Sequence, residues 1–444
     1  MFTILANRTY RHLFLAQVIA LIGTGLATVA LGLLAFEIAG ADSGAVLGTA
    51  MAIKMIAYIG VAPVVGAYAS RLPRRAFLVA MDMVRGLVAL ALPFVDQVWQ
   101  IYVLIFVLQS ASAGFTPTFQ ATIPDILPEE KDYTRALSLS RLAYDMESLL
   151  SPMLSAALLT LVNFHWLFGG TSVGFAVSAL LVISVALPRS TAVAPLGGIW
   201  ARTTIGALIY LKTPRLRGLL AITLAAAAAS AMVIVNTPVL VRAALGLGQR
   251  EVALTLAAFG GGSMLCALAL PRLLDRVADR KVMLAGAALL LLVLVLLAAF
   301  WGMHTEPNFW AFMLAAWLLL GIGYSATVTP GGRLLRKSSG SENRPALFAA
   351  QFALSHVCWL IAYPLTGQVG ALAGFGAAFA VSAVLAAVGT IIALLIWPAA
   401  DIDLVEHSHD DLPADHPHLV NEHANGSPGH AFVIDDLHPR WPDR

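Results

Sequence analysis

The sequence predicts an all-α membrane protein whose twelve transmembrane helices form two pseudo-symmetric six-helix bundles. The first observation is composition: 59% of the 444 residues are hydrophobic and 12% are charged, whereas soluble domains average about 45–50% apolar and about 25% charged residues. A soluble core cannot hide this much apolar surface, which excludes an ordinary cytosolic enzyme, a secreted disulfide scaffold and a disordered protein. The other two observations are the long apolar runs and a motif that recurs in both halves.

The apolar runs set the organisation of the chain. A helix needs about 20 mostly apolar residues to cross the hydrocarbon core of a bilayer. Runs of this kind lie at 12–38, 44–69, 76–95, 98–122, 136–161 and 164–187, and again at 217–241, 251–271, 281–302, 308–329, 346–368 and 371–397. We therefore expect an N-terminal bundle over 1–187, a C-terminal bundle over 217–397 and a tail over 398–444. The cytoplasmic central loop between the bundles, 188–216, is basic and has an amphipathic segment from Leu196 to Leu211.

Basic residues predict the orientation of the helices. Arginine and lysine gather in the linkers on one side of the membrane, and the linkers on the other side have only Arg242 and Arg250. Because basic linkers stay in the cytoplasm, both termini are expected there. The first apolar run is too long for a cleavable signal peptide. We expect a multi-pass protein of the bacterial inner membrane, monomeric, in contact with lipid and with no nucleic-acid partner.

A short basic turn follows the second helix of each half. The first turn reads Gly66-Ala-Tyr-Ala-Ser-Arg71-Leu-Pro-Arg74-Arg75, and the second includes Asp275 and Arg276 in the segment 270–281. Recurrence at matching places is typical of a duplicated bundle. With twelve spans and a basic central loop, these turns resemble the major facilitator superfamily over about residues 8–397. The resemblance implies alternating access, in which two bundles rock about a site near the middle of the membrane.

The first turn departs from the family pattern, because Ser70 replaces the usual aspartate and Pro73 replaces the usual glycine. In the family that aspartate helps to latch the cytoplasmic gate. Asp82 and Arg85 are three residues apart on one helix face, and we expect them to pair and to substitute in the latch. Together with the link Pro124–Pro128, they resemble the drug-export branch that includes nickel-resistance exporters. The expected gating residues are Gly66, Arg71, Arg74, Arg75, Asp82, Arg85, Asp275 and Arg276.

Ionisable residues within the apolar runs are candidates for the transport site, because burying a charge in a bilayer is unfavourable. Arg141 and Asp145 are four residues apart and are expected to pair. Glu147 lies about 200° around the helix from Asp145, since successive residues turn about 100°. It therefore needs another partner or a proton, and Lys54 is the free cation at comparable depth. Glu147 is our candidate for the proton-carrying group, and the alternative is one buried network of all four charges that fixes helix register.

The eleventh span contains two residues that bind soft metals, His356 and Cys358. Their spacing of two directs them to different sides of a helix, so they are not expected to hold one ion together. Histidine and thiolate suit nickel, cobalt or zinc. His356 is a candidate substrate ligand or an interhelical hydrogen-bonding residue, and Cys358 is expected to be a small core residue.

The tail after Pro398 has a different composition. Residues 401–444 have ten acidic residues against two arginines and a net charge of −8 with neutral histidines, so we expect a largely disordered segment. Its candidate metal ligands are His407, His409, His416, His418, His423, His430 and His438, and the alternative is a solvated acidic tail. The apolar stretch from Ala431 to Trp441 is a candidate for docking on the cytoplasmic face.

These features favour a proton-coupled secondary exporter that works by alternating access, with a divalent cation such as nickel or cobalt as substrate. The first alternative is efflux of drugs or other small amphipathic compounds, and a more distant one is a non-transporting metal sensor. The sequence has no HExxH or GxSxG motif and no GxxxxGKS/T nucleotide loop, which argues against an enzyme or an ATP-driven pump. No cofactor is expected, and protons are the expected coupling ion.

Overall fold

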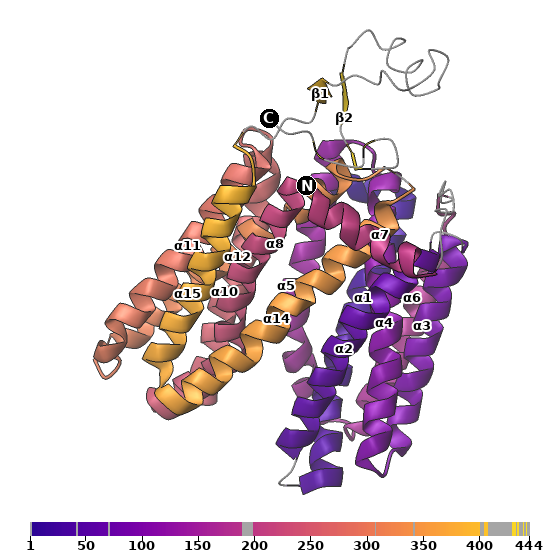
Figure 1. Ribbon diagram of the computed structural model, residues 1–444. Coiled ribbons are helices and arrows are strands. Elements are labelled where there is room, and N and C mark those ends of the chain that lie inside the picture. The colour runs from indigo at the N-terminus through magenta and orange to yellow at the C-terminus, as the bar shows by residue number, and fades with distance from the viewer. Residues whose placement is uncertain are drawn as a thin grey trace, which may run out of the picture.

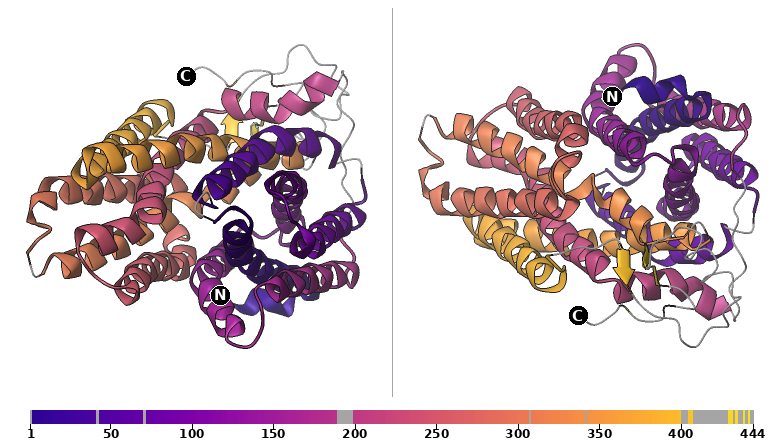
Figure 2. Two further views of the ribbon diagram at one scale, coloured as in Figure 1. Left: turned by 90° about the horizontal axis from the view of Figure 1, so that it is seen from below. Right: turned by 90° about the horizontal axis from the view of Figure 1, so that it is seen from above.

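A computed structural model of the protein describes residues 2–40, 43–69, 72–188, 199–306, 308–340, 342–399, 404–406, 429–431, 433–434, 438 and 441. Its long helices form two bundles, one from each half of the chain (Figure 1). Seen along their long axis, the bundles lie side by side (Figure 2). The predicted all-α, two-bundle fold is therefore confirmed.

The N-terminal bundle contains six long helices, whose short linkers place consecutive helices antiparallel. They are α1 (Arg8–Ala39), α2 (Ser43–Ala69), α3 (Arg74–Ala91), α4 (Val98–Ile126), α5 (Glu130–Leu159) and α6 (His165–Ile183). Local signals fix the ends of α1: the side chain of Asn7 accepts a hydrogen bond from the N–H of Tyr10 at 3.1 Å, as helix N-caps do. At its other end Gly40 has φ of 53°, a backbone conformation that favours glycine.

The C-terminal bundle repeats this arrangement with one irregular helix. Its elements are α8 (Pro214–Ala231), η4 (Met232–Asn236), α9 (Thr237–Val239), η5 (Leu240–Ala244), α10 (Gln249–Leu274), α11 (Asp279–Phe300), α12 (Phe309–Val328), α13 (Gly331–Lys337), α14 (Arg344–Ala373) and α15 (Phe375–Ile396). The segment from α8 to η5 is the single predicted run 217–241, and η4 and η5 are π-helical. Pro238, between them, has no N–H for a regular helical hydrogen bond.

Eleven helices within the described residues are long and apolar enough to cross a membrane. Helix α5 is also long, 30 residues, but Arg141, Asp145 and Glu147 lower its hydropathy. With α5, the number of spans matches the predicted twelve. Helix α7 (Ile199–Lys212) falls in the predicted amphipathic part of the central loop and packs against α2, α8 and α14.

The two bundles meet through α2 with α14 and through α5 with α10. The start of α1 and the end of α15 lie at the same end of the bundles, the upper end in Figure 1, which we call the terminal end. At the other end the helices of the two bundles diverge (Figure 1). The bundles therefore touch most closely near the terminal end.

The expectation of a largely disordered tail stays a prediction, because most of residues 401–444 lie outside the described residues. A few described residues of the tail make ordered contacts. Strand β1 (Leu404–Glu406) pairs antiparallel with β2 (Gly429–Ala431), and Ile434 is buried in the core of the C-terminal bundle. Trp441 lies against this core, with the guanidinium of Arg215 5.4 Å from its ring centroid. The overall acidic composition conceals these apolar residues, which dock the tail as the sequence suggested.

Candidate functional site

A cavity of about 590 Å³ lies between the bundles. At the terminal end it is lined by Tyr133 and Gly332, and it extends to Leu31 and Met51 toward the opposite end. Both bundles line it, chiefly through α1, α2, α4 and α5 on one side and α8, α12, α13 and α14 on the other. Its volume is within the range of small-molecule sites, about 300–1,000 Å³.

Glu147 and Lys54 line this cavity together. The Glu147 carboxylate is directed toward α1, where a Cβ added at Gly25 would lie 3.4 Å from Oε1. Lys54, on α2, interacts electrostatically with Glu147, and its Nζ lies 5.5 Å from the Tyr58 ring centroid. Within the described residues no ion pair of 4 Å or less joins Glu147 to Lys54. Lys54 and Glu147 thus lie in the same cavity and do not form a direct ion pair with each other.

Arg141 and Asp145 form the predicted ion pair, and the pair faces the C-terminal bundle. Arg141 Nε donates to Ser263 Oγ on α10 at 3.2 Å, and its guanidinium lies 4.9 Å from the ring centroid of Tyr324 on α12. The side chain of Asp145 is 3% exposed. Within the described residues no ion pair of 4 Å or less joins Arg141 to Glu147 or Lys54 to Asp145, so the four charges are not connected by ion pairs into one network.

Asp82 and Arg85 also pair, as predicted, but they take no part in a latch between bundles. Asp82 accepts a hydrogen bond from Ser178 on α6 at 2.8 Å. The guanidinium of Arg85 lies between Phe115 and Phe175, 4.1 Å and 4.5 Å from their centroids. These partners all belong to the N-terminal bundle. The expectation that the pair substitutes in the gate is therefore wrong, because these contacts of the pair stay within one bundle, although Arg85 also lines the cavity.

His356 lies in the cavity wall among aromatic rings. Its ring centroid is 4.6 Å from that of Tyr58 and 4.4 Å from that of Phe352. Nδ1 lies 2.6 Å from the backbone oxygen of Phe352; since a carbonyl only accepts, Nδ1 carries the proton and Nε2 keeps its lone pair. Cys358 is buried among Ala227, Ala231 and Ala362, so it is a core residue, as predicted.

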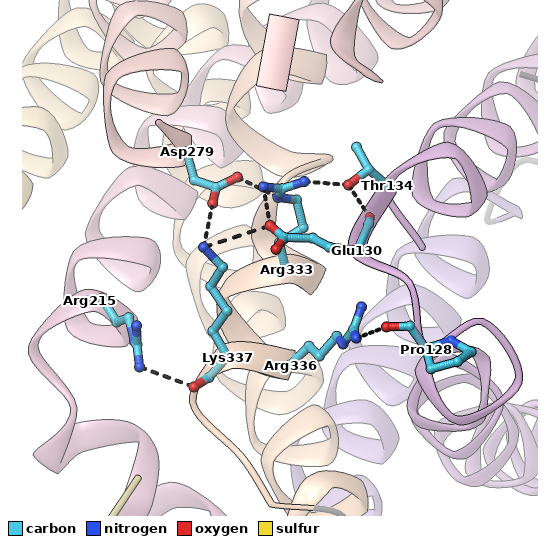
Figure 3. Close-up of polar contacts among 8 residues, drawn as sticks. All are labelled: Pro128, Glu130, Thr134, Arg215, Asp279, Arg333, Arg336 and Lys337. Atoms are coloured by element: carbon cyan, nitrogen blue, oxygen red, sulfur yellow. Dashed lines mark hydrogen bonds and ion pairs between the residues drawn. The ribbon is translucent and has the colours of Figure 1, made fainter. Parts of the chain in front are cut away.

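A latch of charged side chains joins the bundles at the terminal end (Figure 3). Arg333 on α13 pairs with Glu130 and donates to Thr134, both on α5, and its Nε lies 2.7 Å from Asp279 Oδ1 on α11. Lys337 Nζ lies 3.7 Å from Glu130 Oε1 and 3.6 Å from Asp279 Oδ2.

Arg336 donates to the backbone oxygen of Pro128, and Tyr133 Oη donates to that of Gly332 at 3.2 Å. We call this group the inter-bundle latch.

Asp125, at the end of α4, makes a second bridge between the bundles. It accepts from Arg74 of its own bundle, 2.5 Å away, and from Arg344 of the C-terminal bundle. Arg74 is therefore the one predicted basic gating residue that contributes to contacts at the bundle interface within the described residues. It does so indirectly, by holding the carboxylate that Arg344 reaches.

The other predicted gating residues have different positions. Gly66 faces α14, where an added Cβ would lie 2.4 Å from Cβ of Ala349, so only glycine permits this approach. Arg75, Asp275 and Arg276 are exposed, and Arg71 lies outside the described residues. Sequence reasoning missed Glu130, Asp279 and Arg333. Asp279 stands four residues after Asp275 in the recurring basic turn, which was a usable signal, whereas nothing local marks Arg333.

Two of the seven predicted histidine ligands, His430 and His438, are among the described residues. His407, His409, His416, His418 and His423 lie outside the described residues. His430 is part of β2, and His438 is buried, 4% exposed. Within the described residues no group of three histidine, cysteine, aspartate or glutamate side chains is placed to hold a metal ion.

The fold and the cavity have counterparts among known proteins. The sequence-family model of the Major Facilitator Superfamily matches residues 13–240 and 219–414. The chain therefore belongs to this superfamily and is a membrane transporter. An uncharacterized MFS-type transporter, YfiS of Bacillus subtilis (strain 168), is 27% identical over 127 residues. That match covers 29% of this chain and 30% of YfiS, less than a third of either protein.

Solved structures show the same fold at low identity. The human organic anion transporter MFSD10 has a TM-score of 0.73 at 14% identity, over 87% of this chain and 99% of that one. A bacterial homologue of the iron transporter ferroportin, in an outward-facing state, has a TM-score of 0.71 at 14% identity, over 87% and 98%. The proton:xylose symporter XylE has a TM-score of 0.70 at 13% identity, over 88% and 94%. The likeness to all three concerns the fold alone.

Proposed function

We propose that this chain is a proton-coupled secondary transporter of the bacterial inner membrane, and that the cavity between its bundles is the transport site. The observation that carries the proposal is that Glu147 and Lys54 line one cavity at the junction of two bundles. Ionisable residues within membrane spans face such cavities when they bind ions, protons or substrate. Arg141 is paired with Asp145 and Arg85 with Asp82, which leaves Glu147 as the carboxylate without an ion pair and our candidate for the group that takes up and releases a proton.

The basic linkers support a cytoplasmic terminal end. In that orientation the inter-bundle latch closes the cytoplasmic side while the helices diverge toward the outside, which corresponds to an outward-facing state. Transport then requires the latch to open and the bundles to close at the opposite end, as in alternating access. The contacts of Arg333 and Asp125 are those that must break.

A small organic compound fits this cavity better than the divalent cation that the sequence favours. The positive charge of Lys54 next to Glu147 opposes binding of a cation, and aromatic rings form much of the adjacent wall. A divalent metal stays the second candidate because the tail has many histidines and because Nε2 of His356 is free to accept. Membership of the drug-export branch is part of the same proposal, and the coupling ion is the proton that Glu147 takes up and releases.

The test uses purified full-length protein in liposomes that contain a pH-sensitive dye. A panel of nickel, cobalt, zinc, dyes and antibiotics is added, and proton movement is recorded together with uptake of each compound. We expect at least one organic compound to move protons, and Glu147→Gln to abolish this movement. The matched control is Glu37→Gln, which changes an exposed carboxylate at the end of α1. A Glu147→Gln protein with full proton-driven transport would contradict the proposal.

A parallel test addresses the metal alternative. An efflux-deficient bacterium expresses the full chain or a version that ends at Pro398, and growth is measured with nickel, cobalt and zinc. Protection that weakens on truncation would support metal export with a role for the tail. No protection against any of the three metals, with or without the tail, is the expected result.

A further inference from the structure

We infer that the cargo of this cavity is an organic anion with an aromatic body, and that it binds together with one proton. The inference rests on the proposed function and names its substrate class. It follows from the balance of charge in the cavity, the neighbours of Glu147 and the aromatic wall beside Lys54.

The charge balance leaves one cation and one carboxylate to act on a cargo. Among the described lining residues the cationic side chains are Lys54, Arg85 and Arg141. Arg85 is neutralised by Asp82, and Arg141 by Asp145. Lys54 and Glu147 remain, and they interact electrostatically without an ion pair of 4 Å or less.

Among the described residues that line the cavity, Glu147 is the one carboxylate, so no second anion there attracts a cation. From α2 it faces Lys54 and Tyr58, and from its own helix Tyr144. Helix α1 lines the cavity here with side chains that do not ionise. Arg85, already paired, and His356 lie elsewhere in the lining. Protonation of Glu147 therefore changes the electrostatic environment of Lys54 more than that of the other charged lining residues.

Proton binding at Glu147 and anion binding at Lys54 assist each other. When Glu147 is ionised it compensates Lys54, and when it is protonated Lys54 presents an uncompensated positive charge to the cavity. An anion then binds more tightly, and by linkage the bound anion favours the protonated form of Glu147. A cation is repelled by Lys54 in both forms. Anion and proton thus move in the same direction, which is co-transport and not exchange.

The wall beside Lys54 fits a flat apolar body. Tyr58 packs against Phe352 and His356 with ring centroids 4.8 Å and 4.6 Å apart, and Trp359 continues the cluster 5.9 Å from His356. All four residues line the cavity. Aromatic rings favour offset-stacked or edge-to-face contacts with another ring. An anionic group at Lys54 thereby places an attached ring against this wall.

The test compares three probes of one shape: 1-naphthoate, neutral 1-naphthamide and cationic 1-naphthylmethylamine, with Ni²⁺ alone as a fourth probe. Binding to the purified full-length protein is measured between pH 6 and pH 8, and proton movement is followed in liposomes. We expect naphthoate to bind more tightly at lower pH, by up to about tenfold per pH unit for one linked proton. We also expect proton and naphthoate to enter the liposomes together.

Two variants test the roles of Glu147 and Lys54 separately. Glu147→Gln is expected to bind naphthoate with no pH dependence and to move no protons. Lys54→Gln is expected to lose naphthoate binding at every pH, while the exposed Lys281→Gln serves as its control. Naphthoate binding that persists in Lys54→Gln, or preference for the amine or Ni²⁺ in the unchanged protein, would overturn the inference.

Failure of the inference and failure of the proposed function give different results. If the amine or Ni²⁺ exchanges for protons and Glu147→Gln stops the exchange, the transport site is correct and the cargo assignment is wrong. If no probe and no panel compound moves a proton in a Glu147-dependent way, the proposed function itself fails.

Discussion

Arg333 on α13 and Glu130 on α5 form an ion pair that joins the two bundles. The Arg333 side chain is 9% exposed and also contacts Asp279 of its own bundle. A single guanidinium therefore connects the start of α5 with the start of α11. Loss of one partner in a buried pair is destabilising because the other charge is left without compensation, so this contact is suited to control which end of the cavity is closed.

Arg333→Gln is expected to shift the protein toward states open at the terminal end. Because Glu130 is half exposed, we expect the free-energy difference between the states to change by about 1–3 kcal/mol, less than for a fully buried pair. This corresponds to roughly a 5- to 150-fold change in the ratio of the two states. The measurement is the distance between spin labels at Arg75→Cys and Arg276→Cys, two exposed positions at this end. Arg272→Gln, also exposed, is the control. An unchanged distance distribution would show that the latch does not set the state.

Gly66→Ala is expected to disturb the contact of α2 with α14. The new methyl group would lie 2.4 Å from Cβ of Ala349, and overpacking of this kind typically costs about 1–3 kcal/mol. Ala349→Gly in the same protein should restore the thermal stability, because it removes the atom that clashes. Gly48→Ala is the control, since nothing lies within 4 Å of its added Cβ. Equal stability of the Gly66→Ala and Gly48→Ala proteins would contradict the close approach.

Asp145→Asn and Arg141→Gln are each expected to lower thermal stability more than the double variant does. Each single change leaves a buried group without its charged partner, an effect of about 3–5 kcal/mol for a buried pair. The double variant removes both charges at once. A double-mutant cycle of melting temperatures measures the coupling, and strictly additive effects would mean that the pair contributes no net interaction.

Trp441→Ala is expected to loosen the tail from the C-terminal bundle. The variant removes the contact of the indole ring with the buried Arg215, worth up to about 2 kcal/mol for a desolvated cation–π pair. Arg215 also donates to Ser338 Oγ at 2.8 Å and to the backbone oxygen of Lys337 at 3.1 Å, so the change reaches the latch residue Lys337. Hydrogen exchange over α13 should increase. Unchanged protection in α13, compared with the unmodified protein, would limit the effect to the tail.

The sequence by itself determined the membrane-spanning helices and the short-range ion pairs. Burial of apolar side chains in lipid needs runs of a fixed length, so the runs predict the spans without knowledge of packing. Asp82 with Arg85 and Arg141 with Asp145 were predictable for a related reason, because helix geometry places residues three or four apart side by side.

Only the tertiary structure decided how the bundles meet and which charges face the cavity. Glu130 and Arg333 are 203 residues apart in the sequence, and their contact depends on the packing of two bundles that no local pattern encodes. For the same reason the helix position of Asp82 and Arg85 could not show that their partners belong to one bundle. The tail is polar on average, and the docking of Ile434 and Trp441 depends on the surface that the folded C-terminal bundle presents to them.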